Sequence, residues 1–338
     1  MDVMCIGALT WDVIGVVHQL AEPGKPVHFD RGIEIGVGGK AGNVAVDLVK
    51  LGLEGSKVCV VSPLGHDKWG DLLENRLNEL SITVRSQRVS GKPTALCMGI
   101  ILNGSYNQWY GMCSINNEFD VNHIIAEIQE LKPRFVVATA ASSFTRIEEG
   151  LEDILSVAKK VGSKVYIDLI RFGHVSVLDR AEKALGDAIK YVDVLQSTFP
   201  LSEGGYDKGE IRKTMDGLFR SGVKLVLLSM EEAGLAGGTS KYRFVVPAFK
   251  VKPVCPTGAG DALSASVLYN LVKSEGDVDF DFSEEDFQNL LLEASAAGAS
   301  SVMGIGATSK VSRFMVDDLI ARHAVELRDR IRNLKDLQ

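Results

Sequence analysis

Residues 256–262, with the sequence PTGAGDA, combine the residue types that are needed to hold and transfer a phosphoryl group. Gly258, Ala259 and Gly260 would present consecutive backbone N–H groups at the start of a helix, where the helix dipole favours an anion. Asp261 lies in the first turn of that helix and could accept the proton of a hydroxyl group that attacks phosphorus. The alternative is that Asp261 only stabilises the helix as a first-turn acidic residue. The segment therefore predicts an anion-binding turn beside a general base.

Residues 36–43, with the sequence GVGGKAGN, form another glycine-rich segment that leads directly into a predicted helix. Glycines there permit close backbone approach, and N–H groups at a helix start favour an oxygen-rich or anionic ligand. A P-loop is excluded, because Glu34 occupies the position of its first glycine. As a G-x-G-x-x-A fingerprint the segment would indicate a dinucleotide-binding oxidoreductase, but that fingerprint belongs directly after the first strand of a βαβ unit. A structural turn without a ligand is the remaining alternative.

The elements that must position these segments follow a regular alternation of apolar runs and amphipathic stretches. The predicted strands are 3–8, 57–61, 135–139, 164–168, 192–196 and 224–229, and the predicted helices between them are 41–51, 68–80, 121–131, 146–161, 179–188 and 208–220. This alternation is typical of βαβ units, whose right-handed crossovers place helices on both faces of a sheet. We therefore predict a doubly wound α/β fold with a mostly parallel sheet. Later in the chain we expect a hairpin of 235–238 and 242–246, then helices 258–272, 287–303 and 313–334.

Two stretches, 26–35 and 83–111, break the alternation and look like short strands joined by turns. Within the second stretch, Asn103-Gly104 between two apolar runs is a strong hairpin signal. We predict one α/β domain over residues 1–338, with the strands of a small lid inserted at about 13–37 and 83–115. A plain surface excursion is the alternative.

The predicted lid also carries apolar side chains that could make contacts. Met98, Ile100 and Leu102 alternate on one face, which predicts a homodimer formed through the lid. The aromatic residues in or near the lid are Trp11, Phe29, Trp109 and Tyr110. They could stack on a ligand or form the apolar core of that dimer.

Composition excludes several classes of protein. The 338 residues are 46% hydrophobic and 24% charged, which is ordinary for a globular protein and argues against extensive disorder. With 37 Lys and Arg against 44 Asp and Glu, the net charge is −7, so we expect a small-molecule partner and no nucleic acid or membrane. The five cysteines are scattered without C-x-x-C spacing, which disfavours a disulfide framework and a zinc site. Together with the lack of a signal-peptide pattern, this predicts a cytoplasmic location.

The two glycine-rich segments, in this order and at this spacing, resemble the two signatures of the ribokinase (PfkB) family of sugar and nucleoside kinases. The resemblance rests on GGKAGN at 38–43 and TGAGD at 257–261, and it extends to GALTWD at 7–12, LGHDKWGD at 64–71 and KPTA at 92–95. It implies a ribokinase-like fold and a kinase that uses ATP and Mg²⁺. The γ-phosphoryl group would pass to a hydroxyl of a sugar, a sugar phosphate or a nucleoside.

The same resemblance implies a role for particular residues. The residues that would hold acceptor hydroxyls are Asp12, Gly39, Lys40 and Asn43, and those that would bind the nucleotide are Thr257, Ser229 and Gly234. Asp261 would be the catalytic base, and Gly258, Ala259 and Gly260 would form the anion hole for the transferring group. The resemblance assigns no residue to the metal.

Four positions depart from the family's pattern. Thr198 and Leu201 stand where the family usually has the Asn and Glu of an Asn-x-x-Glu motif near the metal. Glu231 replaces a glycine beside the nucleotide phosphates, and Cys255 replaces an aspartate, either as a reactive thiol or as an inert small apolar residue. Two hypotheses remain open: an active small-molecule kinase with an unusual donor site, and a catalytically weak or inactive member that binds a sugar or a nucleotide.

Overall fold

A computed structural model describes residues 1–30, 32–102, 106–140, 145–170, 175–202, 205–274, 276 and 278–334. These residues form a ten-stranded sheet with the order β14-β13-β12-β11-β10-β9-β8-β1-β4-β5. Its strands are β1 (Val3–Ile6), β4 (Val58–Gly65), β5 (Thr83–Val89), β8 (Phe135–Ala140), β9 (Lys164–Leu169), β10 (Val194–Thr198), β11 (Leu225–Ser229), β12 (Leu235–Gly238), β13 (Arg243–Val246) and β14 (Arg332–Asn333). From β5 to β11 every neighbouring pair is parallel, whereas β12, β13 and β14 are antiparallel additions at one edge.

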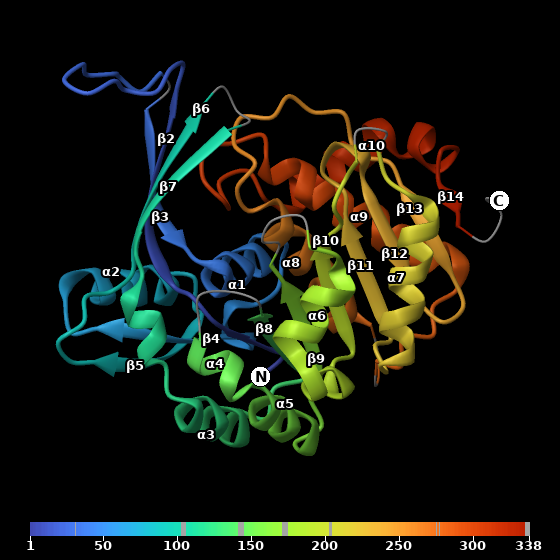
Figure 1. The fold of residues 1–338 in the computed structure, drawn as a ribbon, viewed down its shortest axis with the longest axis horizontal. Helices are drawn as coiled ribbons and strands as arrows, with labels where there is room; N and C mark the ends of the chain where they lie inside the picture. The colour runs from blue at the N-terminus through green and yellow to red at the C-terminus, as the bar shows by residue number, and fades with distance from the viewer. Residues whose placement is uncertain are drawn as a thin grey trace.

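Helices cover both faces of this sheet (Figure 1). They are α1 (Lys40–Lys50), α2 (Lys68–Asn78), α3 (Val121–Leu131), α4 (Thr145–Glu149), α5 (Leu151–Lys160), α6 (Val177–Leu185), α7 (Lys208–Arg220), α8 (Ala259–Lys273), α9 (Glu284–Ser301) and α10 (Arg313–Arg328). Successive residues of β1 enter opposite cores: Val3 and Cys5 pack with α1, α8 and α9, while Met4 and Ile6 pack with α3, α5 and α7. Because strand side chains alternate between the two faces, a sheet buried on both sides needs this continuous apolar sequence. The doubly wound fold is therefore confirmed.

Two predicted helices differ from the structure. The helix expected over 146–161 is divided into α4 and α5 at Gly150, where a Cβ atom would lie 2.4 Å from Val121. The helix expected over 313–334 ends at Arg328, and the chain then adds the short strand β14 beside β13. Leu334 after this strand is fully buried, so the end of the described chain is held by packing against the sheet rather than by a longer helix.

A smaller four-stranded sheet with the order β3-β2-β6-β7 stands beside the main body (Figure 1). Its strands are β2 (Thr10–Val17), β3 (Ile33–Gly38), β6 (Leu96–Leu102) and β7 (Tyr106–Met112). The expected lid segment at 83–115 is divided between the two sheets, because β5 pairs with β4 in the large one. β6 and β7 form the antiparallel pair that the hairpin signal indicated, while the Asn103-Gly104 turn lies outside the described residues.

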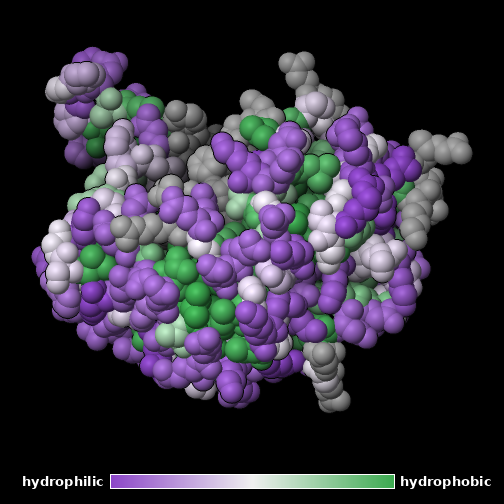
Figure 2. Space-filling model, turned by 60° about the horizontal axis from the view of Figure 1, so that its bottom comes forward, coloured by the Kyte–Doolittle hydropathy of each residue, from purple (hydrophilic) through white to green (hydrophobic). Residues whose placement is uncertain are grey.

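One face of the small sheet packs on the body, and the other is open to solvent. Ile14 and Val16 of β2 and Ile101 of β6 form an apolar cluster with Cys255. Figure 2 shows the sheet projecting from the body, with hydrophobic side chains visible between hydrophilic ones. No helix in the described ranges is both long and apolar enough to span a membrane.

Candidate active site

A cavity of about 510 Å³ lies between the inner face of the small sheet and the starts of α1 and α8. It is lined by Ala8, Thr10, Asp12, Gly39, Lys40, Asn43, Cys97, Trp109, Cys113, Asn116, Thr139, Ile170, Pro256, Thr257, Gly258, Ala259, Gly260 and Asp261. All the residues that the sequence predicted for the acceptor, the base and the anion hole are therefore brought together here. Of the three predicted nucleotide residues, only Thr257 lines the cavity; Ser229 and Gly234 do not.

Glycines place the starts of both helices at this cavity. Gly39 precedes α1 with a φ of 76°, and Gly258 precedes α8 with a φ of 87°. A Cβ atom on either residue would lie within 2.4 Å of a backbone oxygen, that of Ala8 or that of Ala307. Only glycine fits such a left-handed, crowded turn. Since the first N–H groups of a helix have no partner within it, each start offers donors to an anion or an oxygen-rich ligand.

Asp261 is held at the centre of a hydrogen-bond network that joins both glycine-rich segments. Lys40 donates to its Oδ1 atom at 3.0 Å, and the Asn43 side-chain amide donates to its Oδ2 atom at 2.8 Å. Only 5% of Asp261 is exposed, and it lines the cavity. Each carboxylate oxygen accepts one of these two hydrogen bonds and has two lone pairs, so a proton from a bound hydroxyl could still be accepted.

Lys40 also forms an ion pair with Asp168 at the end of β9. Burial alone would lower the pKa of Lys40, but the negative charges of Asp168 and Asp261 outweigh it and raise that pKa. Burial raises the pKa of Asp168, against the effect of Lys40. The ammonium group therefore stays charged between two carboxylates. Sequence reasoning missed Asp168; an acidic residue at the carboxyl end of a buried parallel strand was the available signal.

Asp12 lies on the inner face of the small sheet. Thr10 donates to its Oδ1 atom at 2.5 Å. Burial raises the pKa of Asp12 to about 6, and the negative charge of Asp261 adds to the increase while the Thr10 hydrogen bond opposes it. At neutral pH this carboxylate can accept hydrogen bonds from a ligand in the cavity.

Some polar atoms at the cavity lack partners. Within the described part of the chain, Asn43 Oδ1, Asn116 Oδ1 and Thr257 Oγ1 are buried and accept or donate no hydrogen bond. A buried polar atom without a partner costs free energy, so these atoms favour a ligand that carries hydroxyl groups. Asn116 was not predicted from the sequence, because nothing in its local segment distinguishes it from a surface asparagine.

The anion-binding turn is positioned by a buried glutamine. Gln196, in β10, donates to the Gly260 carbonyl at 2.8 Å, and its own side-chain oxygen accepts from Ser264 at 2.9 Å and from Tyr166. This network fixes the first turn of α8 against the sheet. Gln196 is another residue that sequence reasoning missed, although a polar side chain inside a buried strand was a signal.

The four residues that depart from the family's pattern are not among those that line this cavity. Thr198 and Ser229 are opposite each other at the ends of β10 and β11, and Ser229 donates to Thr198 at 3.3 Å. Glu231 is exposed and has a φ of 51°, the left-handed conformation that glycine adopts without strain. Cys255 is fully buried in the apolar cluster beneath the small sheet, as expected for an inert small residue. Leu201 packs against one of the two cores.

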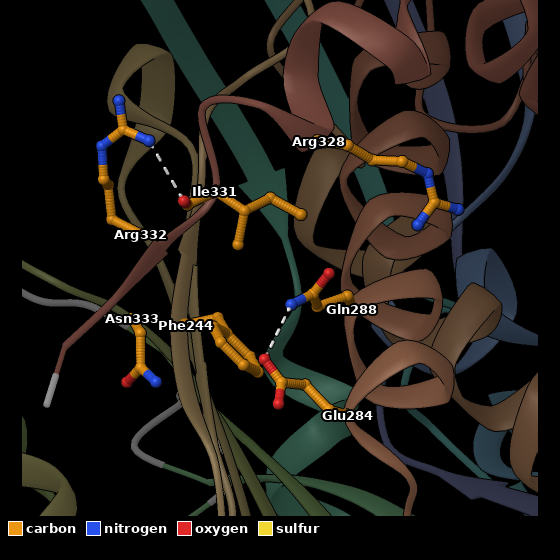
Figure 3. Close-up of a pocket in the computed structure, with 7 residues that line it drawn as sticks. All are labelled: Phe244, Glu284, Gln288, Arg328, Ile331, Arg332 and Asn333. Carbon is orange, nitrogen blue, oxygen red and sulfur yellow. Dashed lines mark hydrogen bonds between the residues drawn. The ribbon is translucent and has the colours of Figure 1, made fainter. Parts of the chain in front are cut away.

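Another cavity, of about 290 Å³, lies between α9, the end of α10 and the edge strands β13 and β14 (Figure 3). Its polar side chains include Glu284 and Gln288, which hydrogen-bond to each other, and Arg332, which donates to the Ile331 carbonyl. None of the residues predicted for chemistry lines this cavity. The cavity beside Asp261 is therefore the candidate active site.

Comparison with known proteins identifies the family of this chain. Residues 1–313 match the model of the pfkB family carbohydrate kinases. An Arabidopsis thaliana protein named "Probable fructokinase-7" is 25% identical over 94% of this chain and 92% of its own length. The ribokinase structure from Giardia lamblia matches 95% of this chain and 99% of its own with a TM-score of 0.77 and 17% identity. The structure of fructokinase with bound ATP from Xylella fastidiosa matches 96% and 99% with a TM-score of 0.72 and 22% identity. The chain therefore belongs to the pfkB family of carbohydrate kinases, which are phosphotransferases with a hydroxyl acceptor.

Proposed function

We propose that this chain transfers the γ-phosphoryl group of ATP to a hydroxyl group of a sugar-like acceptor in the cavity beside Asp261. Asp12 and Asn43 hold neighbouring hydroxyls of the acceptor, because a carboxylate accepts hydrogen bonds and an amide both donates and accepts them. Lys40 and the backbone at Gly39 complete that contact. The Asn43 and Asn116 oxygens that lack partners support a ligand with several hydroxyl donors.

Asp261 is the general base in this proposal. The acceptor oxygen forms a bond to the γ-phosphorus, its proton moves to an Asp261 carboxylate oxygen, and the bond from the γ-phosphorus to the bridging oxygen of ADP breaks. The backbone N–H groups of Gly258, Ala259 and Gly260 stabilise the charge on the transferring group. Lys40, held between Asp168 and Asp261, keeps a positive charge beside the reacting oxygen.

ATP is the proposed donor because Thr257, whose buried hydroxyl has no partner, and the anion-binding turn line the cavity, and because the related Xylella fastidiosa structure contains bound ATP. The described residues contain no group of three or more His, Cys, Asp or Glu side chains that could hold a metal ion. Mg²⁺ is commonly held by substrate phosphates in kinases, and we propose that here it arrives bound to the phosphates of ATP. When bound it neutralises phosphate charge; we assign it no protein ligand.

The observation that carries the proposal is the position of Asp261, which is buried at the cavity. It accepts hydrogen bonds from Lys40 and Asn43, the two polar residues of the GGKAGN segment. The test is a turnover screen of the purified protein with Mg²⁺ and ATP against sugars, sugar phosphates, polyols and nucleosides, with products detected by mass. A phosphorylated product from one acceptor supports the proposal and identifies the acceptor. No product from any acceptor, with thermal stabilisation by a sugar, would instead support a binding protein.

We also propose that two copies associate through the outer face of the small sheet. Ile35, Met98 and Tyr110 lie in one row across β3, β6 and β7 and are 47%, 42% and 60% exposed. Burial of these side chains against a second copy would remove apolar surface from water. Light scattering should show a dimer for the wild type and a monomer for Met98→Glu. Phe314→Glu, at an exposed apolar residue of α10, is the matched control and should leave the dimer intact.

A reducing cytoplasm is the location that we propose. All five cysteines are free thiols, and Cys5, Cys59 and Cys255 are fully buried. Cell fractionation would test this, and recovery of the protein from an oxidising compartment would contradict it.

A further inference from the structure

Two cysteines meet at the acceptor end of the cavity. The sulfur atoms of Cys97, in β6, and Cys113, directly after β7, lie 3.6 Å apart. Both residues line the cavity together with Asp12 and Asn116, and both are partly exposed. This contact could not be predicted from the sequence, because the two cysteines are far from C-x-x-C spacing and only the pairing of β6 with β7 brings them together.

The strand register explains how the two side chains reach each other. Cys97 lies opposite Gly111 in the antiparallel pair, and Cys113 is two residues further along, so its side chain points to the same face. A Cβ atom on Gly111 would lie 3.1 Å from the Cys113 sulfur and 3.4 Å from the Cys97 sulfur. The lack of a side chain at Gly111 therefore leaves room for a diagonal contact between the sulfurs.

We propose that Cys97 and Cys113 are a dithiol modification site, which a peroxide oxidises to a reversible disulfide that weakens acceptor binding. The effect on binding rests on the proposed function, whereas the disulfide itself does not. In a reducing compartment such bonds are usually transient and regulatory rather than structural.

The hydrogen bond between the two thiols makes Cys113 easier to ionise than Cys97. The hydrogen bond from Cys97 lowers the pKa of Cys113 to about 7, although burial acts in the opposite direction. The Cys97 thiol is correspondingly harder to ionise: its hydrogen bond to Cys113 raises its pKa, and burial adds to the increase. The lowered pKa favours the thiolate form of Cys113, and the thiolate is the nucleophile in cysteine oxidation.

The chemistry is balanced with one peroxide. The Cys113 thiolate attacks one peroxide oxygen, an S–O bond forms and the O–O bond breaks, and the departing hydroxide takes up a proton to become water. The Cys97 sulfur then attacks the Cys113 sulfenic acid: the S–S bond forms, the S–O bond breaks, and the second hydroxide leaves as water with the Cys97 proton. The two thiols lose two electrons, and hydrogen peroxide is reduced to two waters. A dithiol reductant such as dithiothreitol reverses the change by thiol–disulfide exchange.

The disulfide would act on the acceptor half of the cavity. A disulfide bond is about 2.05 Å long, so the two sulfurs must approach from their present 3.6 Å separation. Cys97 is the register partner of Asp12 on the neighbouring strand, and Asn116 follows Cys113 by one short turn. Movement of either cysteine therefore displaces groups that face the acceptor. The anion-binding turn at Gly258–Gly260 belongs to another element, so nucleotide binding should be unaffected.

The test combines mass spectrometry with binding measurements on the full-length protein. Folded wild-type protein treated with hydrogen peroxide should lose the mass of two hydrogen atoms, and peptide mapping should find Cys97 joined to Cys113. The acceptor identified by the turnover screen, with D-fructose as the first probe, should bind about tenfold more weakly after oxidation, equivalent to about 1.4 kcal/mol, and dithiothreitol should restore it. ATP affinity should not change. Cys97→Ser and Cys113→Ser should each prevent the disulfide, whereas Cys255→Ala should not.

Each outcome decides a separate part of the proposal. If the folded wild type forms no Cys97–Cys113 disulfide, the modification site is overturned, whatever the protein's activity. If the disulfide forms but acceptor affinity stays the same, its effect on the site is overturned. Absence of product in the turnover screen would count against the proposed function alone, because the mass measurement needs no turnover.

Discussion

The two halves of the cavity are built in different ways. The proposed acceptor half is made of charged and amide side chains that come from both sheets and from α1 and α8: Asp12, Lys40, Asn43, Asp168 and Asp261. Lys40 and Asn43 contact Asp261 directly, and Lys40 also contacts Asp168. The donor half is mainly a backbone turn ahead of α8, held from behind by the Gln196 side chain. Side-chain identity thus defines one half, and the path of the backbone defines the other.

None of the departures from the family's pattern replaces a side chain of the proposed acceptor half. Glu231 keeps a left-handed backbone conformation, and Cys255 fills an apolar contact beneath the small sheet. Such positions can change residue type as long as the backbone keeps its path. Substitutions in the acceptor half should therefore have large effects, and substitutions in the donor half should have small ones.

Asp261→Asn should have the largest effect, because it removes the proposed base while keeping the shape of the side chain. We expect kcat to fall by about 10²- to 10⁴-fold, with acceptor affinity changed only a few-fold. Steady-state kinetics and calorimetric binding would measure the two quantities. Asp286→Asn, which also removes a carboxylate from the first turn of a helix, is the matched control. If both variants keep full activity and lose only stability, Asp261 serves the helix alone.

Asp12→Asn should have the next largest effect, on acceptor binding. Loss of a buried charged hydrogen-bond acceptor should weaken binding by about 1 to 3 kcal/mol. The pKa of Asp12 is raised to about 6, so wild-type affinity should fall as the pH drops through 6 and the carboxylate becomes protonated. Calorimetric titrations between about pH 5 and pH 8 should show this dependence in the wild type and a flat profile in the variant. A flat wild-type profile would place the acceptor away from Asp12.

Asp47→Asn should have the next largest effect, on stability. Asp47 is a carboxylate behind the proposed acceptor half, and neither binding nor catalysis explains its presence. Asp47 lies in α1, is fully buried, and neither of its oxygens has a hydrogen-bond partner among the described residues. Burial raises its pKa, with the charge of Asp261 adding to the increase and that of Lys50 opposing it. Because the folded-state pKa is above the unfolded value, stability is fully present at low pH and is lost as the pH rises through the folded-state pKa.

The asparagine variant cannot ionise, so it should be more stable than the wild type by at least about 1 kcal/mol at pH 8, and the difference should shrink as the pH falls. Urea unfolding at several pH values would measure this. The matched control is Asp193→Asn, since buried Asp193 pairs with Lys159 at 2.6 Å and accepts from the Val165 N–H at 2.8 Å. That variant should be less stable than the wild type. A loss of stability in both variants would mean that Asp47 has a partner it needs.

Local sequence signals predicted the parts of the site that lie within one segment. Gly39, Lys40 and Asn43 start one helix, Gly258 and Asp261 start another, and each group is recognisable from glycines followed by a polar residue at a helix start. The alternation of apolar runs likewise predicted the large sheet, because strands buried on both faces need continuous apolar sequence.

The parts that were missed depend on contacts between distant segments. Asp168, Gln196 and Asn116 join the site only because parallel strands end at one edge and the small sheet folds back over that edge. The contact between Cys97 and Cys113 depends on strand register, which the sequence alone did not determine. The short strand β14 was missed for the same reason, since a two-residue strand forms only where β13 is present to pair with it.

Glu231→Gly should have the smallest effect and tests the donor half. Glu231 has a φ of 51°, which costs a non-glycine residue about 1 kcal/mol or more, while glycine adds a comparable entropy to the unfolded chain. We therefore expect stability within about 1 kcal/mol of the wild type, on the stabilised side, and a KM for ATP changed less than about threefold. Glu232→Gly is the matched control, because that exposed neighbour has no left-handed conformation and should only lose stability. If Glu231→Gly instead lowers the KM for ATP more than about tenfold, the carboxylate repels the phosphates. Side-chain identity would then matter in the donor half as well, and the contrast between the two halves would fail.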